Sequence, residues 1–536
     1  MNAPSSASAS VAPPRWLAAG VLALGAAAFA GTLTGGFLGD DFVYVARFLE
    51  LPWAAWPGFF TQEWSGGLWG FPLKELRPFA ALSFMADARL WGDSAIGWRL
   101  TNLVLLLGSA WCVMRLAGRY SAQPARAALI AGLIFVLHPV QTEPVAWITG
   151  RVDLLAALAA LAYWCAAENY CDTRRGSWLA VALAALFGGI FSKEFCLLAP
   201  GLLLLAWLLI PSPTQPSWKP RLILLAGSLG MIALYAWCRH QAFGGGATQG
   251  NTSPQDPAVW QRQASYLGWL LPWLPGVPRH EFAAPPAGAL IRTAWLAAVA
   301  AVLAGSVWLR WRRRTTAATI LFFGGAWWLV TTAGLLFVGY FSPRHLHFTT
   351  VGLALAAGVA LAAIPRRGWR TVVVTALFGW LVTVQWRAVR PWREAGRLSA
   401  GVLTAAQAEL GRAPAGALLA VAVPSTWQTA WLWSWSAPHF AAPPFLHPGL
   451  PPERVLFGEG NYYRGDWLAR VAPGYAAAVA RAPAVVALWI GPDARMHCRT
   501  VVGAELALGA ATLASLSENG LTDAEWTTWV QQLSPQ

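Results

Sequence analysis

The chain alternates between long apolar runs and short polar connections. The runs recur at about 20 residues, the length that an α-helix needs to cross the hydrocarbon core of a membrane. We therefore predict a polytopic α-helical membrane protein with about 11 transmembrane helices. The predicted spans are residues 16–34, 98–116, 127–141, 153–170, 178–191, 195–210, 221–238, 290–309, 317–338, 346–364 and 370–387. The first run resembles a signal peptide, but it is long enough to span, so we expect it to remain as the first helix.

Basic residues predict the orientation of these spans. Lysine and arginine concentrate in the cytoplasmic connections of membrane proteins, and here they occupy every second connection. The basic positions are Arg15, Arg115, Arg119, Arg126, Arg174, Arg175, Lys219, Arg221, Arg310, Arg312, Arg313, Arg314, Arg366, Arg367 and Arg370. We expect the N terminus on the cytoplasmic side and the C terminus on the outer side.

One connection is unusually polar for its position between two spans. The stretch from residue 137 to 155, LHPVQTEPVAWITGRVDLL, contains His138, Glu143, Arg151 and Asp153. Ionisable groups at membrane depth are costly, and lipid-facing backbone must stay regular, so such a cluster indicates a functional site. We expect a helix to surface here, turn along the outer membrane face and re-enter at Asp153.

The other connections on the predicted outer face also carry ionisable groups. They are a first outer loop at residues 35–97 with the pair Asp40-Asp41, the segment Ser192-Lys193-Glu194, a long outer loop at residues 239–286 and the segment Ser342–His347. Acidic, basic and imidazole groups would then share one membrane face, which predicts an active site there.

The composition changes near residue 391, and we predict two domains, a membrane domain at residues 1–390 and an extracytoplasmic domain at residues 391–536. Ala415–Val423 and Ala484–Ile490 have the pattern of short strands. Thr522–Leu533 has the pattern of a short helix capped by Thr522. About 145 residues suffice for a small α/β domain with its own core.

Composition and charge agree with this picture. Of the 536 residues, 57% are hydrophobic and 12% are charged, against about 25% charged residues in soluble domains. The net charge of +14 would favour a nucleic-acid partner in a soluble protein. Because the basic residues lie between apolar runs, membrane orientation explains them, and we expect no nucleic-acid partner. The six cysteines have no metal-type spacing and predict no disulfide framework.

Several segments carry a family resemblance, in the same order along the chain. They are Gly39-Asp40-Asp41, Arg77-Pro78, LWGDSAIGWRLTNLVLLL, HPVQTEPVAWITGRVDLLAAL, Phe191-Ser192-Lys193-Glu194 and SPRHLHFTTVG. They resemble the paired acids, RP…LWG…LTN, HPVHTEAVA…GRADLLAAL, SKE and ERYLYLPSVG segments of the transmembrane and tetratricopeptide-repeat-containing O-mannosyltransferases and their bacterial relatives. The resemblance covers about residues 35–400.

The resemblance implies a GT-C-fold membrane glycosyltransferase. Such an enzyme would move a mannose-like sugar, with inversion, from a polyprenyl-phosphate donor to an acceptor hydroxyl at the periplasmic face of a bacterial inner membrane. Its partners would be membrane lipid, the lipid-linked donor, and a protein, lipid or glycan acceptor. The chain departs from the family where Gln141 replaces a second histidine and where Pro343 and His345 replace a glutamate and a tyrosine. A C-terminal domain takes the place of the repeats.

Transfer from such a donor requires a base for the acceptor hydroxyl and cations for the departing phosphate. Asp40 and Asp41 are the catalytic candidates. Adjacent carboxylates on a loop point in different directions, so we expect only one to act, with a pKa raised by its neighbour. Arg344 and Lys193 are the candidates for binding phosphate. Arg77 either reaches the phosphate or anchors the first outer loop.

The remaining candidates for the substrate site are His138, Glu143, Arg151, Asp153, Glu194 and His345. His138 and Glu143 either orient substrate or hold a divalent cation, although no ligand spacing is diagnostic of a metal. Arg151 and Asp153 either pair with each other and fix the turn or act directly on substrate.

Two other classes of protein share many helices and buried charges. A transporter, or a lipid or glycan flippase, would show internal repeats and ionisable groups near the bilayer midplane. We find no inverted repeat, and the charges lie at the ends of spans. An O-antigen-type polymerase or ligase would share the compartment and the lipid donor. The sequence leaves open the sugar, the acceptor and the role of the C-terminal domain, for which acceptor recognition is one hypothesis.

Overall fold

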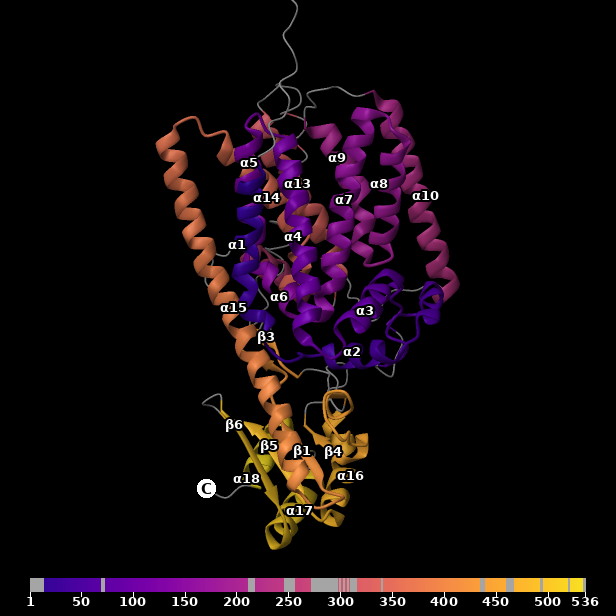
Figure 1. The fold of residues 1–536 in the computed structure, drawn as a ribbon, viewed down its shortest axis with the longest axis vertical. Coiled ribbons are helices and arrows are strands. Elements are labelled where there is room, and N and C mark those ends of the chain that lie inside the picture. The colour runs from indigo at the N-terminus through magenta and orange to yellow at the C-terminus, as the bar shows by residue number, and fades with distance from the viewer. Residues whose placement is uncertain are drawn as a thin grey trace, which may run out of the picture.

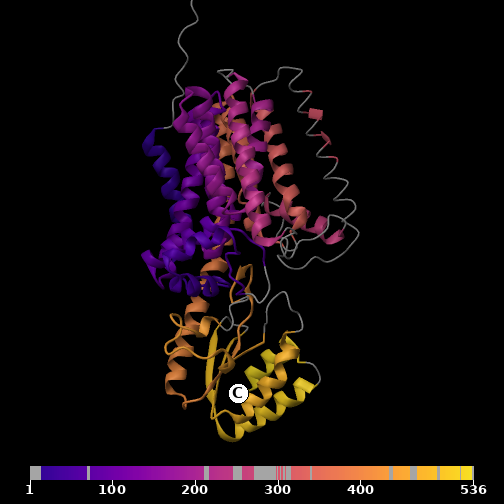
Figure 2. The same ribbon diagram turned by 90° about the vertical axis from the view of Figure 1, so that its right-hand side faces the viewer.

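The computed structural model describes residues 14–68, 73–210, 217–244, 256–270, 316–338, 341–433, 439–458, 467–491, 495–518 and 521–533, with isolated helical positions between 297 and 308. In these parts of the chain, helices run side by side as a bundle, and a smaller α/β unit lies at one end of the bundle (Figures 1 and 2). We call this α/β unit, which follows the bundle in sequence, the C-terminal unit.

The bundle consists mainly of long apolar helices. They are α1 (Arg15–Leu33), α4 (Ala95–Arg119), α5 (Pro124–Leu137), α7 (Arg151–Thr173), α8 (Gly176–Ile190), α9 (Ala199–Leu209), α10 (Trp218–Phe243), α13 (Thr316–Ala333), α14 (Thr349–Ala362) and α15 (Arg367–Arg412). Among the described residues, six helices are long and apolar enough to cross a membrane, and the bent pair formed by α5 and Pro139–Ala146 makes a seventh if it is one span.

These helices make the chain a polytopic α-helical membrane protein. Three further apolar helices, within Gly176–Ile190, Glu194–Leu209 and Thr349–Ala362, are shorter than a full span. The count of eleven spans stays a prediction, because the expected span at residues 290–309 lies mostly outside the described residues.

Small residues bring the bundle helices into close contact. A Cβ added to Gly358 of α14 would lie 2.6 Å from the Cβ of Ala131 in α5, and one added to Gly324 of α13 would lie 2.5 Å from the Cβ of Ala356 in α14. Lipid tails are as apolar as leucine, so membrane helices associate through such close packing rather than through the hydrophobic effect.

Short elements gather at one end of the bundle, which we call the site end. They are α2 (Asp41–Glu50), η1 (Trp53–Phe60), α3 (Pro78–Trp91), η2 (Pro139–Gln141), α6 (Thr142–Ala146), η3 (Ile148–Gly150), η4 (Glu194–Leu198), η5 (Gly334–Phe337) and η6 (Pro343–Leu346). The C-terminal unit adjoins the same end (Figure 1). The basic connections that follow α4 and α7, and the start of α15, lie at the opposite end.

Part of the predicted long outer loop at residues 239–286 is helical. α10 continues to Phe243, and α11 spans Pro257–Leu270. Tyr266 and Leu270 of α11 are buried in a cluster with Val140 and Leu346. This helix therefore packs on the site end, and residues 245–255 and 271–286 of the predicted loop lie outside the described residues.

α15 joins the bundle to the C-terminal unit. It has 46 residues and contains Pro391, so the predicted boundary between residues 390 and 391 lies inside a continuous helix. At about 1.5 Å per residue it is about 69 Å long, which is enough to cross a membrane and continue beyond it. In Figure 1 it runs along the edge of the bundle and ends beside the sheet.

The C-terminal unit is built on a four-stranded sheet of order β4-β1-β5-β6. Its elements are β1 (Leu418–Ala422), β4 (Val455–Phe457), β5 (Val485–Ile490), β6 (Met496–Val501), α16 (Trp467–Arg481), α17 (Gly503–Glu518) and α18 (Asp523–Gln532). β1 pairs in parallel with β4 and β5, and β6 is antiparallel to β5. β1, β5 and α18 lie at the predicted positions, and Thr522 forms a capping box with Glu525.

A single apolar core joins the C-terminal unit to the site end. The same buried cluster contains Phe42 and Trp147 from the site end and Val421 and Leu488 from the sheet. Because water is excluded from a shared core, the two parts of the molecule are packed as one body at this junction.

Candidate active site

The polar stretch after α5 is buried throughout. It forms three short helical turns, η2, α6 and η3, before α7 begins at Arg151, and every residue from His138 to Leu154 is buried. The predicted turn is present between α5 and α7, and its position along the membrane face stays a prediction. The first outer loop and the C-terminal unit cover this turn, so its side chains face protein groups rather than the membrane surface.

Asp41 is the first residue of α2, and its carboxylate is fully engaged. Oδ2 accepts a hydrogen bond from the backbone N–H of Leu38 at 3.1 Å. Oδ1 accepts from the backbone N–H and the hydroxyl of Thr149, both at 3.1 Å. Burial raises the pKa of Asp41, Arg99 and these donors lower it, and the resulting pKa is about 6. Asp41 therefore ties the first outer loop to the turn before α7.

Asp40 precedes Asp41 and has a different environment. Its Oδ1 is buried and has no hydrogen-bond partner among the described residues. Burial and the negative charge of Asp41 raise the pKa of Asp40, the positive charge of Arg344 opposes both, and the resulting pKa is about 7. A buried carboxylate that titrates near neutral pH, with an oxygen free to accept a proton, has the properties of a general base. Of the two predicted acids, Asp40 fits this role better.

Arg344 interacts electrostatically with Asp40 and also approaches the ion pair formed by Asp153 and Lys193. Its guanidinium carbon lies 4.2 Å from the centre of the Trp147 ring, which is the geometry of a cation–π contact. Its Nε lies 3.8 Å from Oδ2 of Asp153. The same carboxylate binds the ammonium of Lys193 at 2.6 Å through Oδ1. Asp153, at the start of α7, thus holds two of the predicted phosphate ligands next to each other.

Arg77 belongs to the same region. It binds Glu75 at 2.8 Å and Glu194 at 3.3 Å, so it also anchors the first outer loop to the turn before α9. Burial lowers the pKa of Lys193, and the charges of Arg344 and Arg77 lower it further, whereas Asp153 raises it. Lys193, Arg344 and Arg77 therefore influence one another electrostatically, as a site for an anion requires.

Glu143 organises the segment that carries Arg344. Its Oε2 accepts the backbone N–H of Arg344 at 3.2 Å. Its Oε1 accepts the hydroxyl of Ser342 at 2.8 Å and the indole N–H of Trp431 at 2.9 Å. Glu143 is buried, and both of its oxygens are used by protein donors.

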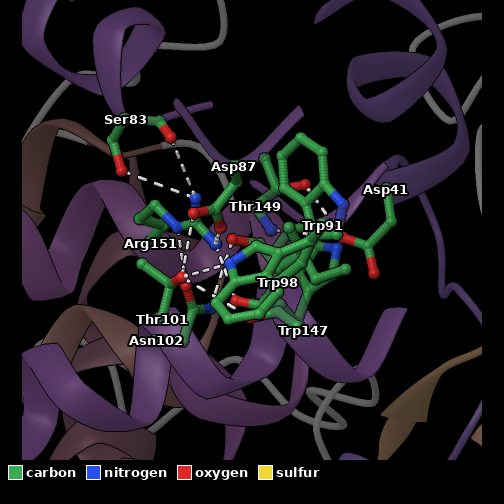
Figure 3. A network of polar contacts seen from close by, with 12 residues as sticks. Asp41, Ser83, Asp87, Trp91, Trp98, Thr101, Asn102, Trp147, Thr149 and Arg151 are labelled. Carbon is green, nitrogen blue, oxygen red and sulfur yellow. Dashed lines mark hydrogen bonds and ion pairs between the residues drawn. The ribbon is translucent and has the colours of Figure 1, made fainter. Parts of the chain in front are cut away.

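Arg151 does not pair with Asp153, so one of the two alternatives that the sequence left open for these residues, an ion pair between them, is wrong. Residues two apart on a helix do not face each other. Arg151 instead binds Asp87 of α3 at 2.5 Å, and it donates to Asn102 at 2.7 Å and to the carbonyl of Trp98 at 2.7 Å. Figure 3 shows this network beside Asp41, Thr149 and Trp147. It holds the start of α7 against α3 and α4.

The histidines have different surroundings. His138 contacts the carbonyl of Leu270 at 3.0 Å and accepts the backbone N–H of Val140 at 3.4 Å, so it joins η2 to α11. Nδ1 of His345 lies 2.8 Å from the hydroxyl of Tyr266, and burial holds the pKa of His345 well below its usual range.

His347 is fully buried and bonds Gln141 through Nδ1. Its Nε2 is without a hydrogen-bond partner in the part of the chain that the structure describes. Burial and the positive charge of Lys193 lower the pKa of His347, Asp153 raises it, and the resulting pKa is about 4. His347 is therefore neutral at pH 7 and has a ring nitrogen available beside the charged cluster.

No group of three or more His, Cys, Asp or Glu side chains that could hold a metal ion occurs among the described residues. Both oxygens of Glu143 and both ring nitrogens of His138 already contact protein groups. The described geometry therefore gives no support to the divalent cation that the sequence left open for these two residues.

The structure adds four residues to the predicted set. Trp147 and Thr149 lie within the polar stretch that the sequence singled out, so their positions were available as a signal. Asp87 and Trp431 had no such signal, because their partners are distant in sequence. The arrangement as a whole combines an acidic residue suited to accept a proton with a group of cations suited to bind an anion.

Comparison with known sequences gives relatives of one kind. No family model matches the chain. The chain is 27% identical to protein O-mannosyl-transferase Tmtc2 of Drosophila melanogaster over 260 aligned residues. This alignment covers 45% of this chain and 27% of that protein. Over 168 residues the chain is 31% identical to protein O-mannosyl-transferase TMTC4 of Homo sapiens, which covers 28% of this chain and 22% of that protein. The resemblance predicted from the motifs is confirmed, over roughly a quarter of the relatives' length.

Comparison with solved structures finds ArnT from Cupriavidus metallidurans in the apo state, with a TM-score of 0.48 and 16% identity over 89% of this chain and 93% of that chain. It also finds the Archaeoglobus fulgidus oligosaccharyltransferase tethered to an acceptor peptide, with a TM-score of 0.44 and 12% identity over 90% of this chain and 74% of that chain.

Proposed function

We propose that this chain is a membrane glycosyltransferase of the GT-C type. It would transfer a mannose-like sugar from a polyprenyl-phosphate donor to an acceptor hydroxyl, with inversion, at the periplasmic face of a bacterial inner membrane. The acceptor would be a protein, a lipid or a glycan. The sequence similarity to protein O-mannosyl-transferases supports the choice of a mannose-like sugar.

The observation that carries the proposal is the electrostatic interaction between Asp40 and Arg344 in a buried site. Asp40 offers a buried oxygen without a hydrogen-bond partner among the described residues, and Arg344 is close enough to lower its pKa. A base and a cation in that relation suit a displacement in which the acceptor hydroxyl attacks the anomeric carbon while the phosphate departs on the other side.

Each group then has one task. Asp40 takes the proton of the acceptor hydroxyl as the new glycosidic bond forms. Arg344 and Lys193, with Arg77 beside them, balance the charge that develops on the departing polyprenyl phosphate. Arginine can bind two phosphate oxygens at once, whereas lysine acts as a point charge. A phosphate is a good leaving group, so no general acid is required.

The test is transfer from labelled polyprenyl-phosphate mannose by the purified protein, with a membrane extract as the source of acceptor. Wild type is compared with Asp40→Asn, which keeps the shape of the side chain and removes the base. We expect labelled product with wild type and at least a 100-fold lower rate with the variant, because general-base catalysis contributes about 100-fold to 10,000-fold.

Equal rates for the two proteins would contradict the assignment of Asp40. Absence of both donor binding and turnover in the wild type would contradict the enzyme and favour a transporter or flippase. Donor binding without turnover would support the assignment of a polyprenyl-phosphate donor. It would contradict the assignment of the sugar or of the acceptor.

A further inference from the structure

A short hairpin of the C-terminal unit reaches the candidate active site. Its strands are β2 (Thr426–Trp427) and β3 (Ala430–Trp431), which pair antiparallel with Thr426 opposite Trp431. The backbone N–H of Leu432 donates to the carbonyl of Ser425 at 2.9 Å and closes the hairpin. We call residues 425–433 the site hairpin. It is far from the other site residues in sequence and is carried by the unit that follows α15.

The site hairpin contacts the loop that carries the proposed base. The carbonyl of Leu432 accepts the backbone N–H of Gly39 at 2.7 Å, and Gly39 directly precedes Asp40. Gly39 has a φ of 53°, a left-handed conformation that glycine adopts without the steric cost other residues meet. Leu432 is fully buried, so this hydrogen bond is shielded from water and fixes the backbone next to Asp40.

The neighbouring residue contacts the opposite half of the site. The indole N–H of Trp431 donates to Oε1 of Glu143 at 2.9 Å, and Glu143 accepts the backbone N–H of Arg344 through its other oxygen at 3.2 Å. The Trp431 ring also lies 6.1 Å from the ring of Trp147, the ring against which the Arg344 guanidinium packs.

We propose that the site hairpin positions the active site, with Trp431 and Leu432 as positioning residues that set the proposed base and the phosphate-binding arginine at a fixed separation. Leu432 contacts the loop that carries Asp40, and its neighbour Trp431 contacts Glu143, which holds the segment of Arg344. A shift of the hairpin therefore changes the distance between Asp40 and Arg344. The proposal rests on the proposed function. It gives the C-terminal unit a role inside the site, in addition to any part in acceptor recognition.

The proposal predicts an effect on turnover rather than on donor affinity. Reacting groups must be held within about 0.5 Å of the productive geometry, and a misplacement of about 1 Å costs about 100-fold in rate. The donor phosphate is bound by Arg344, Lys193 and Arg77, two of which have no contact with the hairpin in the hydrogen bonds and ion pairs described above. Loss of the Trp431 hydrogen bond therefore loosens the site while most of the binding contacts remain.

The test compares Trp431→Phe with Trp526→Phe. Each removes one buried indole N–H and keeps an aromatic ring. Trp526 donates to the carbonyl of Val421 at 2.9 Å inside the C-terminal unit, so it controls for the loss of an indole hydrogen bond there. We expect Trp431→Phe to lower kcat about 10-fold to 100-fold with a donor KM within about twofold of wild type. Trp526→Phe should leave kcat unchanged. Equal kcat values for the two variants would overturn the proposal.

A second measurement needs no variant. Hydrogen–deuterium exchange of the wild-type protein is followed with and without polyprenyl phosphate. We expect residues 425–433 to gain protection together with residues 342–347 and 37–42. Protection of residues 342–347 alone would overturn the role of the hairpin and leave the proposed function in place. Protection of none of these segments would count against the proposed function itself, and with it the proposal that depends on it.

Discussion

Asp40 and Asp41 are chemically identical neighbours, and their surroundings give them different roles. Asp41 accepts three hydrogen bonds from Leu38 and Thr149. Asp40 keeps a buried oxygen without a partner among the described residues. The first is suited to hold the loop, and the second is suited to accept a proton. This distinction depends on the direction of the backbone at the start of α2. The sequence shows only that two aspartates are adjacent, so it does not reveal this direction.

Substituting each aspartate with alanine should separate these roles by stability. Asp41→Ala leaves two buried backbone N–H groups and the Thr149 hydroxyl without an acceptor, and one unsatisfied buried donor costs about 1–3 kcal/mol. Asp40→Ala removes a carboxylate whose burial is unfavourable in the charged form. We expect the free energy of unfolding in detergent to fall by at least about 1–3 kcal/mol with Asp41→Ala and to change little with Asp40→Ala. The reverse order would show that Asp40 is the structural residue.

The pH dependence of transfer should report the ionisation of Asp40. The base acts in its deprotonated form, and the pKa of Asp40 is raised to about 7. We therefore expect kcat/KM to increase as the pH rises through about 7 and then to level off. The positive charge of Arg344 lowers this pKa, so Arg344→Gln should move the rising limb to higher pH.

Lys193→Gln is the matched control for this shift. Lys193 pairs with Asp153 and shares the phosphate-binding role, so its loss should raise the donor KM. One charge-assisted hydrogen bond is worth about 1.5–3 kcal/mol, which corresponds to about a 10-fold to 150-fold increase in KM. The rising limb should keep its position. If the limb moved equally in both variants, Arg344 would have no special relation to the base.

At the scale of elements, an ion pair between α7 and α3 fixes the start of α7. Arg151 is fully buried and binds Asp87 of α3, whereas Asp153 binds Lys193. Because the two residues point to different sides of α7, one helix start anchors α3 and also presents a carboxylate to the cationic cluster.

A double-mutant cycle should show which pair is coupled. Removing one partner of a buried ion pair typically costs about 3–5 kcal/mol, because the other charge is left uncompensated. We expect that cost for Arg151→Ala or Asp87→Ala alone, measured by unfolding in detergent, and a double variant less destabilised than the sum of the two. The cycle of Arg151→Ala with Asp153→Ala should be close to additive. Strong coupling in that second cycle would support the pairing of Arg151 with Asp153 that the sequence offered as one of two alternatives.

Elements with local signals could be predicted from the sequence, and contacts between distant segments could not. The apolar runs predict α1, α4, α7 and α10 because membrane length and hydropathy are local properties. The strands β1 and β5 and the capped helix α18 are predicted for the same reason. The partners of Arg151 and Glu143 lie on other elements, and which carboxylate faces which cation depends on how the helices pack. The site hairpin was missed altogether, since each of its strands has only two residues.

At the scale of the whole molecule, the two ends of the bundle differ in charge and in content. The elements α2, α3 and α6 and the C-terminal unit lie at the site end (Figure 1). The connections after α4 and α7 and the start of α15, at the opposite end, carry Arg119, Arg174, Arg175, Arg366 and Arg367. Since arginine and lysine favour the cytoplasmic side, we predict that the site end faces the periplasm. That orientation would allow the site to use a donor displayed on the outer leaflet.

Fusion reporters in a bacterial host test this orientation. Alkaline phosphatase is active only in the oxidising periplasm, where its disulfides form, so a fusion after Gln536 should be active. The same enzyme inserted in the connection after Arg175 should be inactive, which makes it the internal control. Opposite activities at the two positions would require the site to face the cytoplasm. One continuous helix, α15, leads from the basic end of the bundle to the C-terminal unit. If α15 crosses the membrane once, the two fusion sites lie on opposite sides of the membrane, so the two reporters cannot both be active.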